Sequence, residues 1–575
     1  MGTVGRKAVW GAALALWVMI PAASASAAGS GGQKTDRLLQ ENTSSGSPRT
    51  VIIRTRPGAK DRVKKRLPNR RSGPQEHQII GGLSADMDSK EIAALSSDPD
   101  VLSVSADAEV NASAVTTSPA TAAASVNLNQ TGTTSVLKRW LGVQDWFSGS
   151  SLTVAVIDSG IQNGPDFDGR IVGAYDFTTN QGAVASAPID EYGHGTHVAG
   201  LIGSSGASSG GKYAGVAPGV KLLSLRVLDK KGEGKTSNVI RALEFAIVNK
   251  ERFGIKVVNL SLGHPIFESA ASDPLVQAVE EAVRAGLIVV TAAGNYGTNP
   301  STGLAGYAGI ASPGNAPSAI TVGASNAANT VGRGDDRVAP YSSRGPSWYD
   351  GIAKPDVVAP GANLMSNLVD GSTIAKDYPG LIVTDRMTRF LMLNGSSMAT
   401  GVVSGLVAAM LEANNYGGYL RWQSLPAYRR PYTYTGAPTL TANAVKAMLQ
   451  YSATPLRAGN GVKYDALTQG SGEVNGYGAL ALAGSADTTK AAGAFWMSMQ
   501  WPTETVFGAV RAVSGRTLTL RYSAVRSAIR RSSSRCAFGS VVSPRRISRS
   551  YTSSIRALRT LIVSVLFMIL TSMPR

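Results

Sequence analysis

Five short apolar runs separated by helical stretches constrain the fold of this 575-residue chain more than any other feature. Each run is apolar nearly throughout, which is typical of strands covered on both faces. The runs are 153–157, 221–227, 257–262, 287–291 and 320–322. Between them, 239–247 has apolar residues at the spacing of one helix face, and 274–285 ends before Gly286. This alternation predicts an α/β fold, in which a parallel sheet is wound with helices on both faces.

In a sheet of this kind the chemistry lies at the carboxyl ends of the strands. The run 153–157 leads directly into Asp158, which would place a carboxylate at that edge, although a turn Asp is an equally simple explanation. Two of the four histidines follow at 193–200 in GHGTHVAG, whose glycines suggest the start of a tightly packed helix. Two His residues three apart could bind a metal, but no acidic ligand accompanies them at metalloprotease spacing.

A pair of serines precedes a strongly apolar helical stretch. Residues 394–400 read NGSSMAT, and 401–413 are apolar nearly all round, which predicts a buried helix. A serine in its first turn would lie at the positive end of the helix dipole, which favours developing negative charge. Ser396 or Ser397 could equally be a plain N-cap. A hydroxyl nucleophile needs a base, and the base needs an orienting carboxylate, so the three motifs together offer the parts of one catalytic site.

The three motifs resemble those of the subtilisin, or subtilase, family and occur in the same Asp, His, Ser order. The matching segments are AVIDSG at 155–160, HGTHVAG at 194–200 and NGSSMAT at 394–400, with shorter matches GVAP at 215–218, VNLSLG at 258–263, AAGN at 292–295 and SSRGP at 342–346. The resemblance spans about residues 140–480 and implies a serine endopeptidase of broad specificity. It implies that Asp158, His194 and Ser397 form the catalytic triad. Asn295 would then stabilise the oxyanion, together with the backbone N–H of the nucleophile.

The same resemblance indicates where a protein or peptide substrate would bind. The two edges that pair with the substrate backbone would be Gly232, Glu233 and Gly234 on one side, and Ser261, Leu262 and Gly263 on the other. The first specificity pocket would be lined by Ala292, Ala293 and Gly294, with Ala311 and Ser312. Because these residues are small and uncharged, we expect an apolar or aromatic side chain before the cut. Glu233 suggests a preference for basic residues two to four positions upstream.

The first 28 residues have the features of a secretory signal peptide. Arg6 and Lys7 precede an apolar run at 8–20, and small residues follow Pro21. The run is shorter than the ~20 residues that a membrane-spanning helix needs, which favours cleavage over anchoring. We therefore expect a secreted protein, extracellular or periplasmic.

The remainder of the chain divides into five predicted segments. They are a linker at 29–50, a small α+β unit at 51–105, a second linker at 106–135, the catalytic domain at 136–485 and a tail at 486–575. The unit at 51–105 has strand-like runs at 51–54 and 101–104 and a helical stretch at 86–95. Its size and place resemble the inhibitory pro-segment of the family, which implies that it binds its own enzyme and that activation cleaves the chain within 106–135. A plain accessory domain is the alternative.

The positive charge of the chain is concentrated in its tail. The formal net charge is +18, but residues 505–575 contain 13 Arg and no Asp, Glu or Lys, which leaves 18 − 13 = +5 for the rest. The body therefore lacks the charge of a nucleic-acid-binding surface. The tail is either a basic, membrane-surface or processed segment or the product of a frameshift. Its apolar run at 561–570 is too short to span a membrane.

Metal and cofactor requirements are weakly marked in the sequence. Cys536, in the tail, is the single cysteine, so the body has no disulfide and no thiolate metal site. We assign no metal and no cofactor. Calcium enters by family resemblance alone, because Asp166 matches a calcium-binding position of some relatives while the partner loop at 204–212 lacks their pattern.

The alternative functions are a catalytically silent peptide-binding relative and a basic surface binder driven by the tail. Within the catalytic domain, 415–440 has no clear period and is predicted to be a surface insertion.

Overall fold

The computed structural model describes residues 34–41, 47–68, 73–112, 135–143, 145–179, 182–328, 330–427, 430–431, 433–436 and 438–489. The predicted signal peptide and nearly all of the predicted tail lie outside these residues.

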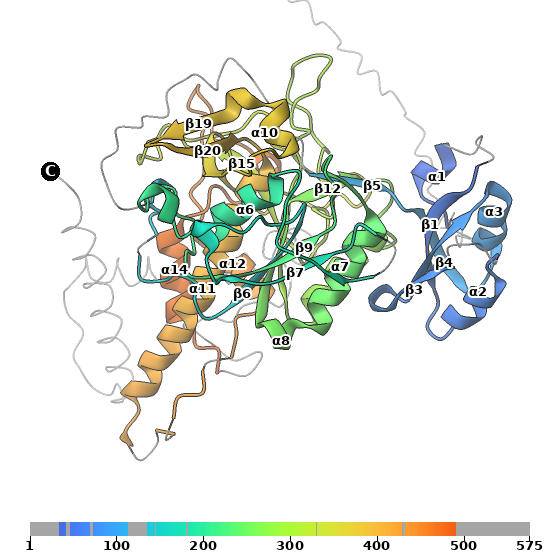
Figure 1. Cartoon of the computed structure of the whole chain (residues 1–575), viewed down its shortest axis with the longest axis horizontal. Helices are drawn as coiled ribbons and strands as arrows, with labels where there is room; N and C mark the ends of the chain where they lie inside the picture. Colours follow the sequence, from blue (N-terminus) through green and yellow to red (C-terminus); the bar gives the residue numbers. More distant parts are fainter. Residues whose placement is uncertain are drawn as a thin grey trace, which may run out of the picture. The chain divides into compact units, whose positions relative to one another are not determined.

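A nine-stranded sheet forms the centre of the main part, in the order β16-β15-β13-β11-β6-β9-β7-β8, with β17 pairing to β15 (Figure 1). Its strands are β6 Thr153–Asp158, β7 Ile171–Asp176, β8 Val184–Ala185, β9 Lys221–Arg226, β11 Ile255–Leu260, β13 Ile288–Ala292, β15 Ile320–Asn326, β16 Arg337–Val338 and β17 Val357–Pro360. All pairs are parallel except those of the short strands β8 and β16. All five predicted runs contribute strands to this sheet, and the predicted α/β class is confirmed.

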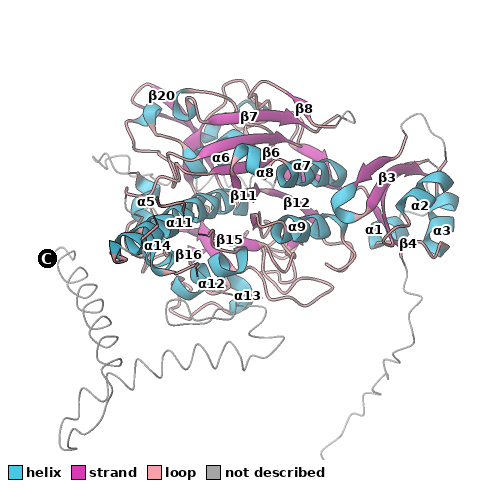
Figure 2. Ribbon diagram, turned by 90° about the horizontal axis from the view of Figure 1, so that it is seen from below, coloured by secondary structure: helices cyan, strands magenta, loops and turns pink. Residues whose placement is uncertain are grey.

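Helices cover both faces of the sheet, and the two faces have separate cores. On one face lie α5 Val136–Leu141, α6 His194–Gly203, α11 Ser396–Ser424, α12 Ala442–Ser452 and α14 Gly476–Ser485, and on the other α7 Thr236–Val248, α8 Lys250–Phe253 and α9 Pro274–Arg284 (Figure 2). Because side chains alternate along a strand, Val154 and Val156 of β6 join the first core, whereas Ala155 and Ile157 join the second. Every residue of β6 is buried, as its unbroken apolar run predicts.

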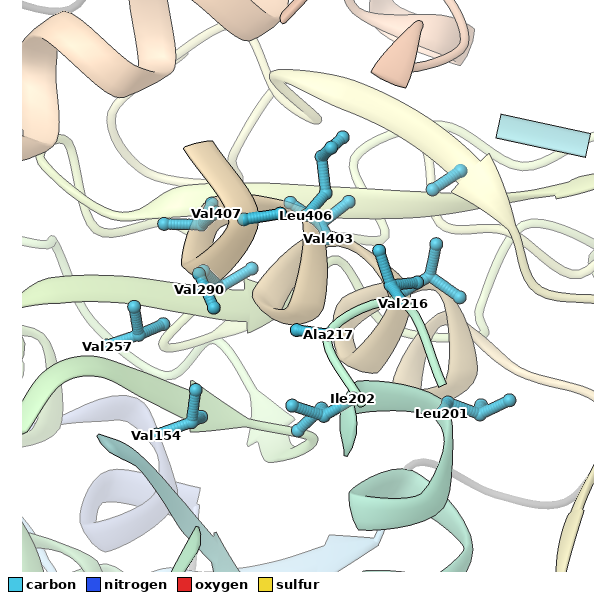
Figure 3. Packing of buried hydrophobic residues seen from close by; sticks show 14 of the residues in the cluster. Val154, Leu201, Ile202, Val216, Ala217, Val257, Val290, Val403, Leu406 and Val407 are labelled. Carbon is cyan, nitrogen blue, oxygen red and sulfur yellow. The ribbon is translucent and has the colours of Figure 1, made fainter. Parts of the chain in front are cut away.

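Helix α11 is the central element of the first core. Val403, Leu406 and Val407 of this helix are fully buried and pack towards Val154 and Val290 of the sheet (Figure 3). Within the described residues, α11 is the one helix whose length and composition would also suit a membrane, but 94% of its most apolar window is buried in the protein. It is therefore a core helix of the folded domain.

The predicted insertion at 415–440 is wrong for its first ten residues. Helix α11 continues to Ser424, and Gly417 and Gly418 are buried within it. A Cβ atom on Gly417 would lie 1.9 Å from the carbonyl oxygen of Gly484. Tyr419 and Trp422 then stack on the outer part of the helix, with their rings 5.8 Å apart. The aromatic residues that obscure the helical period in the sequence thus pack along one side of the helix.

Smaller elements complete the main part. They are β10 Glu233–Lys235, β12 Leu262–Pro265, β14 Ala311–Ser312, the antiparallel sheet of β18 Leu364–Asn367, β20 Thr388–Leu393 and β19 Ile382–Asp385, the helices α10 Thr373–Asp377 and α13 Ala466–Gln469, and the 3-10 turns η2 Pro165–Phe167, η3 Ala207–Ser209 and η4 Pro379–Leu381.

The N-terminal part is a separate α+β unit with its own core. Its antiparallel sheet has the order β2-β3-β1-β4. The elements are α1 Arg37–Glu41, β1 Arg49–Thr55, α2 Lys60–Arg66, β2 Gln75–His77, η1 Gln78–Ile80, β3 Gly82–Met87, α3 Ser89–Ser97 and β4 Val101–Ala106. Val51, Ile53 and Leu83 are fully buried in its core. Residues 86–95 are therefore not helical throughout, since β3 extends to Met87 and Asp88 caps α3.

Both predicted linkers contain ordered structure. Helix α1 lies within 29–50, where the carboxylate of Asp36 accepts hydrogen bonds from the N–H groups of Leu39 and Ala106, both at 2.7 Å. A further strand, β5 Glu109–Ala112, lies within 106–135. The linker predictions therefore fail at these two places because polar composition does not show which backbone groups will find partners.

A buried ionic cluster ties the sheet to α12. The carboxylate of Asp356 lies 2.8 Å from Lys354 Nζ and 3.4 Å from Lys446 Nζ, and all three side chains are fully buried. Burial alone would raise the pKa of Asp356, but the two ammonium groups hold it below its usual value. Burial lowers the pKa of Lys446 to about 7. Each charge in this cluster therefore depends on the others.

We predict that Asp356→Asn lowers the free energy of unfolding by about 3–5 kcal/mol, because it leaves buried lysines without a counter-charge. Urea unfolding at pH 7 measures this. The matched control is Asp370→Asn, whose partner Arg389 lies 2.9 Å away in an exposed pair, and which should cost under about 1 kcal/mol. Equal losses in both variants would contradict the prediction.

Candidate active site

Asp158 and His194 meet where β6 ends and α6 begins. Asp158 is the last residue of β6, and His194 is the first residue of α6. The Nδ1 atom of His194 lies 2.8 Å from Asp158 Oδ1, and both side chains are fully buried. Gly195 permits the contact, because a Cβ atom there would lie 2.2 Å from the carbonyl oxygen of Gly160. The glycines of the two motifs thus bring the carboxylate and the imidazole together.

The environment of His194 is that of a general base. Burial lowers the pKa of this imidazole, but the charge and hydrogen bond of Asp158 outweigh burial and raise the pKa above its usual value. A neutral His194 donates its Nδ1 proton to Asp158, which leaves the lone pair on Nε2. Nε2 is buried and has no hydrogen-bond partner among the residues that the structure describes. This nitrogen can therefore accept a proton from a nucleophile.

Ser397 is the second residue of α11 and is fully buried. Its Oγ donates a hydrogen bond to the carbonyl oxygen of Ser261, at 3.0 Å, rather than to His194. Helices α6 and α11 lie close together one turn after His194 and Ser397. A Cβ atom on Gly401, four residues after Ser397, would lie 3.2 Å from the carbonyl oxygen of Val198, four residues after His194. The first turns of the two helices therefore face one another. A rotation of the Ser397 side chain would be needed to direct its hydroxyl to the base.

The two serines at the start of α11 have different partners. The Oγ of Ser396 accepts a hydrogen bond from the N–H of Gly294 at 3.2 Å. The N–H of Ser396 donates to Oδ1 of Asn295 at 2.9 Å. Asn295 therefore lies beside the first turn of α11, where its side-chain amide can face an oxyanion on Ser397. Ser396 is tied to the loop after β13, whereas Ser397 points to the edge at Ser261.

His197, the second histidine of the motif, is hydrogen-bonded to backbone carbonyl groups. Nε2 of His197 lies 3.1 Å from the carbonyl oxygen of Leu364 and 3.0 Å from that of Leu391. Burial lowers the pKa of His197 to about 3, so the ring is neutral and donates to these carbonyls. Within the described residues, no group of three or more His, Cys, Asp or Glu side chains could hold a metal ion.

The residues around Asp166 do not fit a calcium ion. Oδ1 of Asp166 accepts from the N–H of Ser208 at 2.9 Å, and Oδ2 accepts from Asn367 Nδ2 at 2.6 Å. Arg170 places its guanidinium beside them and donates to the carbonyl oxygens of Gly203 and Asp166. Calcium binding needs six to eight oxygen ligands. Here protein donors and a fixed cation already occupy the oxygens that the ion would use.

The two predicted substrate edges lie on either side of β5. Glu233 and Gly234 of β10 pair antiparallel with Asn111 and Val110. On the other side, Leu262 pairs antiparallel with Ala112, and Gly263 with Asn111. The N–H of Ala112 also donates to the carbonyl oxygen of Gly232 at 3.1 Å. The chain's own segment 109–112 thus occupies the place that the resemblance assigns to a substrate.

Strand β5, which lies between the two predicted substrate edges, is a feature that the sequence analysis did not predict. Val110 and Ala112 are buried, whereas Glu109 and Asn111 are exposed. This polar–apolar alternation at 109–112 is the pattern of a half-buried strand and could have identified it. Four residues are too few for such a pattern to stand out beside an Ala-, Ser- and Thr-rich segment.

The predicted first specificity pocket is assembled from three loops. Ala292 ends β13, and Gly294 follows it with φ 103°, a conformation that favours glycine. The Cβ atom of Ala311 would lie 3.2 Å from a Cβ atom on Gly294 and 3.4 Å from one on Gly263. The methyl group of Ala311 therefore lies between Gly294 and Gly263, on the two sides of the predicted pocket. Ser312 is also buried, but its hydroxyl donates to Asp273 Oδ2 at 2.7 Å and is directed away from this gap.

Comparisons with known proteins show which family this chain resembles. The family model described as Subtilase family matches residues 149–478. Serine protease AprX of Bacillus subtilis (strain 168) is 41% identical over 273 residues, which are 46% of this chain and 58% of that protein. Subtilisin of Bacillus pumilus is 36% identical over 267 residues, which are 46% of this chain and 78% of that protein. The match to AprX thus spans less than two thirds of that relative.

Among solved structures, the fold resembles that of fervidolysin from Fervidobacterium pennivorans. The TM-score is 0.53 at 21% sequence identity, and the alignment covers 76% of this chain and 61% of the other. At this identity the likeness shows a common fold and nothing further.

Proposed function

Because the chain belongs to the subtilase family, whose model matches more than half of it, we propose that it is a secreted serine endopeptidase that hydrolyses peptide bonds through an acyl-enzyme. The observation that carries the proposal is the buried hydrogen bond of 2.8 Å between His194 and Asp158, beside the first turn of α11. Secretion rests on the signal-like features of residues 1–28.

The proposed reaction begins at the hydroxyl of Ser397. Its Oγ forms a bond to the peptide carbonyl carbon while its proton passes to Nε2 of His194, and Asp158 stabilises the imidazolium. The negative charge on the carbonyl oxygen is stabilised by the side-chain amide of Asn295 and the N–H of Ser397. The intermediate then collapses, the C–N bond breaks, and His194 gives its proton to the leaving amine. Water, activated by the same base, hydrolyses the acyl-enzyme and restores Ser397.

Substrate recognition is proposed to rest on backbone pairing between β10 and β12. The way in which β5 pairs with both strands supports this, because an extended peptide can form the same hydrogen bonds whatever its side chains. Broad specificity follows. The pocket around Ala293 and Ala311 has no charged residue among those predicted to line it, so an apolar side chain before the cut is favoured.

The N-terminal unit is proposed to act as an inhibitory pro-segment. Besides supplying β5, it caps α7, since the carboxylate of Asp107 accepts from the N–H of Ser237 at 2.8 Å and from its hydroxyl at 2.7 Å. Ile52 and Ile80 of this unit join the core that contains α7 and α9. Because β5 leaves the cleft at Ala112, we propose that activation cleaves the chain after this residue, within the predicted linker.

A serine-directed fluorophosphonate probe tests the proposed nucleophile. We expect covalent labelling of the wild-type protein and its loss in Ser397→Ala, with turnover of casein falling about 10⁶-fold, as in other triads that lose the nucleophile. Ser396→Ala is the matched control and should still be labelled. A protein that stays unlabelled as wild type, or that is still labelled as Ser397→Ala, would contradict the proposal.

Cleavage of a peptide library tests the proposed specificity. We expect apolar residues to dominate the position before the cut, and basic residues to be favoured two to four positions upstream through Glu233. Glu233→Gln should reduce that upstream preference about twofold to fivefold, the size of an exposed ion pair, without changing the first position. The control is Glu251→Gln on α8. A preference for basic residues directly before the cut would contradict the predicted apolar first position. An upstream preference that is unchanged in Glu233→Gln would contradict the role of Glu233.

The contact between the N-terminal unit and the main part should weaken as pH rises. Burial raises the pKa of Glu268 to about 8, and the carboxylates of Asp273 and of Asp36 in the N-terminal unit raise it as well. The carboxyl of Glu268 also acts on Arg54 of the N-terminal unit. When the unit leaves, the burial it imposes and the charge of Asp36 are removed and the pKa of Glu268 falls towards its usual value of 4.5, so the complex binds the additional proton and loses affinity as the pH rises towards 8, by up to about tenfold per pH unit.

The rate at which activity appears after self-cleavage, followed between pH 5 and pH 9, measures this release. Glu268→Gln should retain the N-terminal unit at all these pH values and remove most of the pH dependence. The same dependence in wild type and Glu268→Gln would show that another group controls the release.

A further inference from the structure

Asp190 is a buried carboxylate four residues before His194, and the triad does not use it. Its side chain is 1% exposed. Oδ1 accepts a hydrogen bond from the N–H of Gly193 at 2.8 Å, and Oδ2 accepts from the N–H and the hydroxyl of Thr196 at 2.8 Å and 2.7 Å. Gly193 and Thr196 lie at the first turn of α6, and the side chain of Ser159 is a further hydrogen-bond partner of Asp190. Burial raises the pKa of Asp190, and these hydrogen bonds at the helix N-terminus and from Ser159 offset part of that effect.

The hydrogen bonds around Asp190 continue into the loop that follows Asp158. The N–H of Ser159 donates to Asp158 Oδ1 at 2.8 Å, and its hydroxyl accepts from the N–H of Gly195 at 2.9 Å. The hydroxyl of Thr196 also accepts from the N–H of Gln162, at 2.9 Å. The end of β6 and the start of α6 are therefore held together on both sides of the Asp158–His194 pair.

The position of His194 in α6 creates an electrostatic problem. As the first residue of the helix, it lies at the positive end of the helix dipole, which disfavours the imidazolium that a general base must become. A carboxylate in the same turn offsets that field. The charge of Asp190 acts on His194 in the direction that raises its pKa, as does that of Asp158.

We propose that Asp190 is a second, positioning carboxylate of the catalytic apparatus, which fixes His194 and stabilises its protonated form against the positive end of α6. The inference rests on the proposed role of His194 as the general base. Asp158 contacts the imidazole and Asp190 does not, so Asp190 acts through the helix that carries the base.

Two variants test the charge of Asp190 against its hydrogen bonds. Asp190→Asn keeps the shape but removes the charge and one accepting oxygen, whereas Thr196→Val removes the hydroxyl that donates to Asp190 and accepts from Gln162, and keeps the charge. In Asp190→Asn we expect the acidic limb of the kcat–pH profile to move to lower pH by about 0.5–1 unit, with a lower plateau and an unchanged KM. In Thr196→Val the acidic limb of the kcat–pH profile should stay at the same pH, even if the maximal kcat changes. If Asp190 were only a structural cap, neither variant would shift the acidic limb.

The titration of the His194 ring by NMR, in a Ser397→Ala background, gives the same readout without catalysis. The ring should titrate about 0.5–1 unit lower with Asp190→Asn than without it. This result stands even if the wild-type protein proves inactive, so failure of the proposed function and failure of this inference can be told apart. If Asp190→Asn does not fold, Asp190→Ser supplies a neutral cap at the same place. An unchanged His194 titration in a folded neutral variant would overturn the inference.

Discussion

The hydrogen bond between Asp158 and His194 is the interaction on which the rest of the site depends. It requires the end of a fully buried parallel strand to touch the first turn of a buried helix, and Gly160 and Gly195 allow that approach. Once these two backbones are fixed, the hydrogen bond to Asp158 holds Nδ1 of the imidazole and leaves Nε2 without a partner among the described residues. The catalytic proposal, the proposed inhibition by β5 and the role inferred for Asp190 all assume that His194 is held by Asp158 in this way.

The edges of β10 and β12 pair with a neighbouring strand through its backbone. Strands β10 and β12 offer their edges to whatever extended segment lies between them, and in this structure the segment is β5 of the same chain. A substrate would therefore compete with 109–112 for the same hydrogen bonds. Under the proposed role of the N-terminal unit, the contacts of Asp107 with Ser237 and of Glu268 would govern how readily the segment leaves.

Several buried charged groups in the main part have compensating groups close at hand. Asp190 is compensated by the start of α6, Asp356 by Lys354 and Lys446, and Arg170 by backbone carbonyl oxygens. The body contains no cysteine, so no disulfide contributes to its stability. Its stability depends instead on two apolar cores, one on each face of the sheet, and on these locally neutralised charges.

The sequence by itself determined the α/β fold, because unbroken apolar runs are local signals that need no knowledge of distant partners. The family resemblance of its Asp and His motifs predicted the contact between Asp158 and His194 that the structure shows, whereas the hydroxyl of Ser397 is directed to Ser261. The sequence did not reveal α1, β5 or the full length of α11, since Asp36, Val110 and Gly417 acquire their partners from segments far along the chain. It also gave Asp190 no distinguishing mark. Only the tertiary structure decided which carboxylates lie buried together and which segment fills the cleft, because burial and backbone pairing are properties of contacts between distant residues and not of any single stretch of sequence.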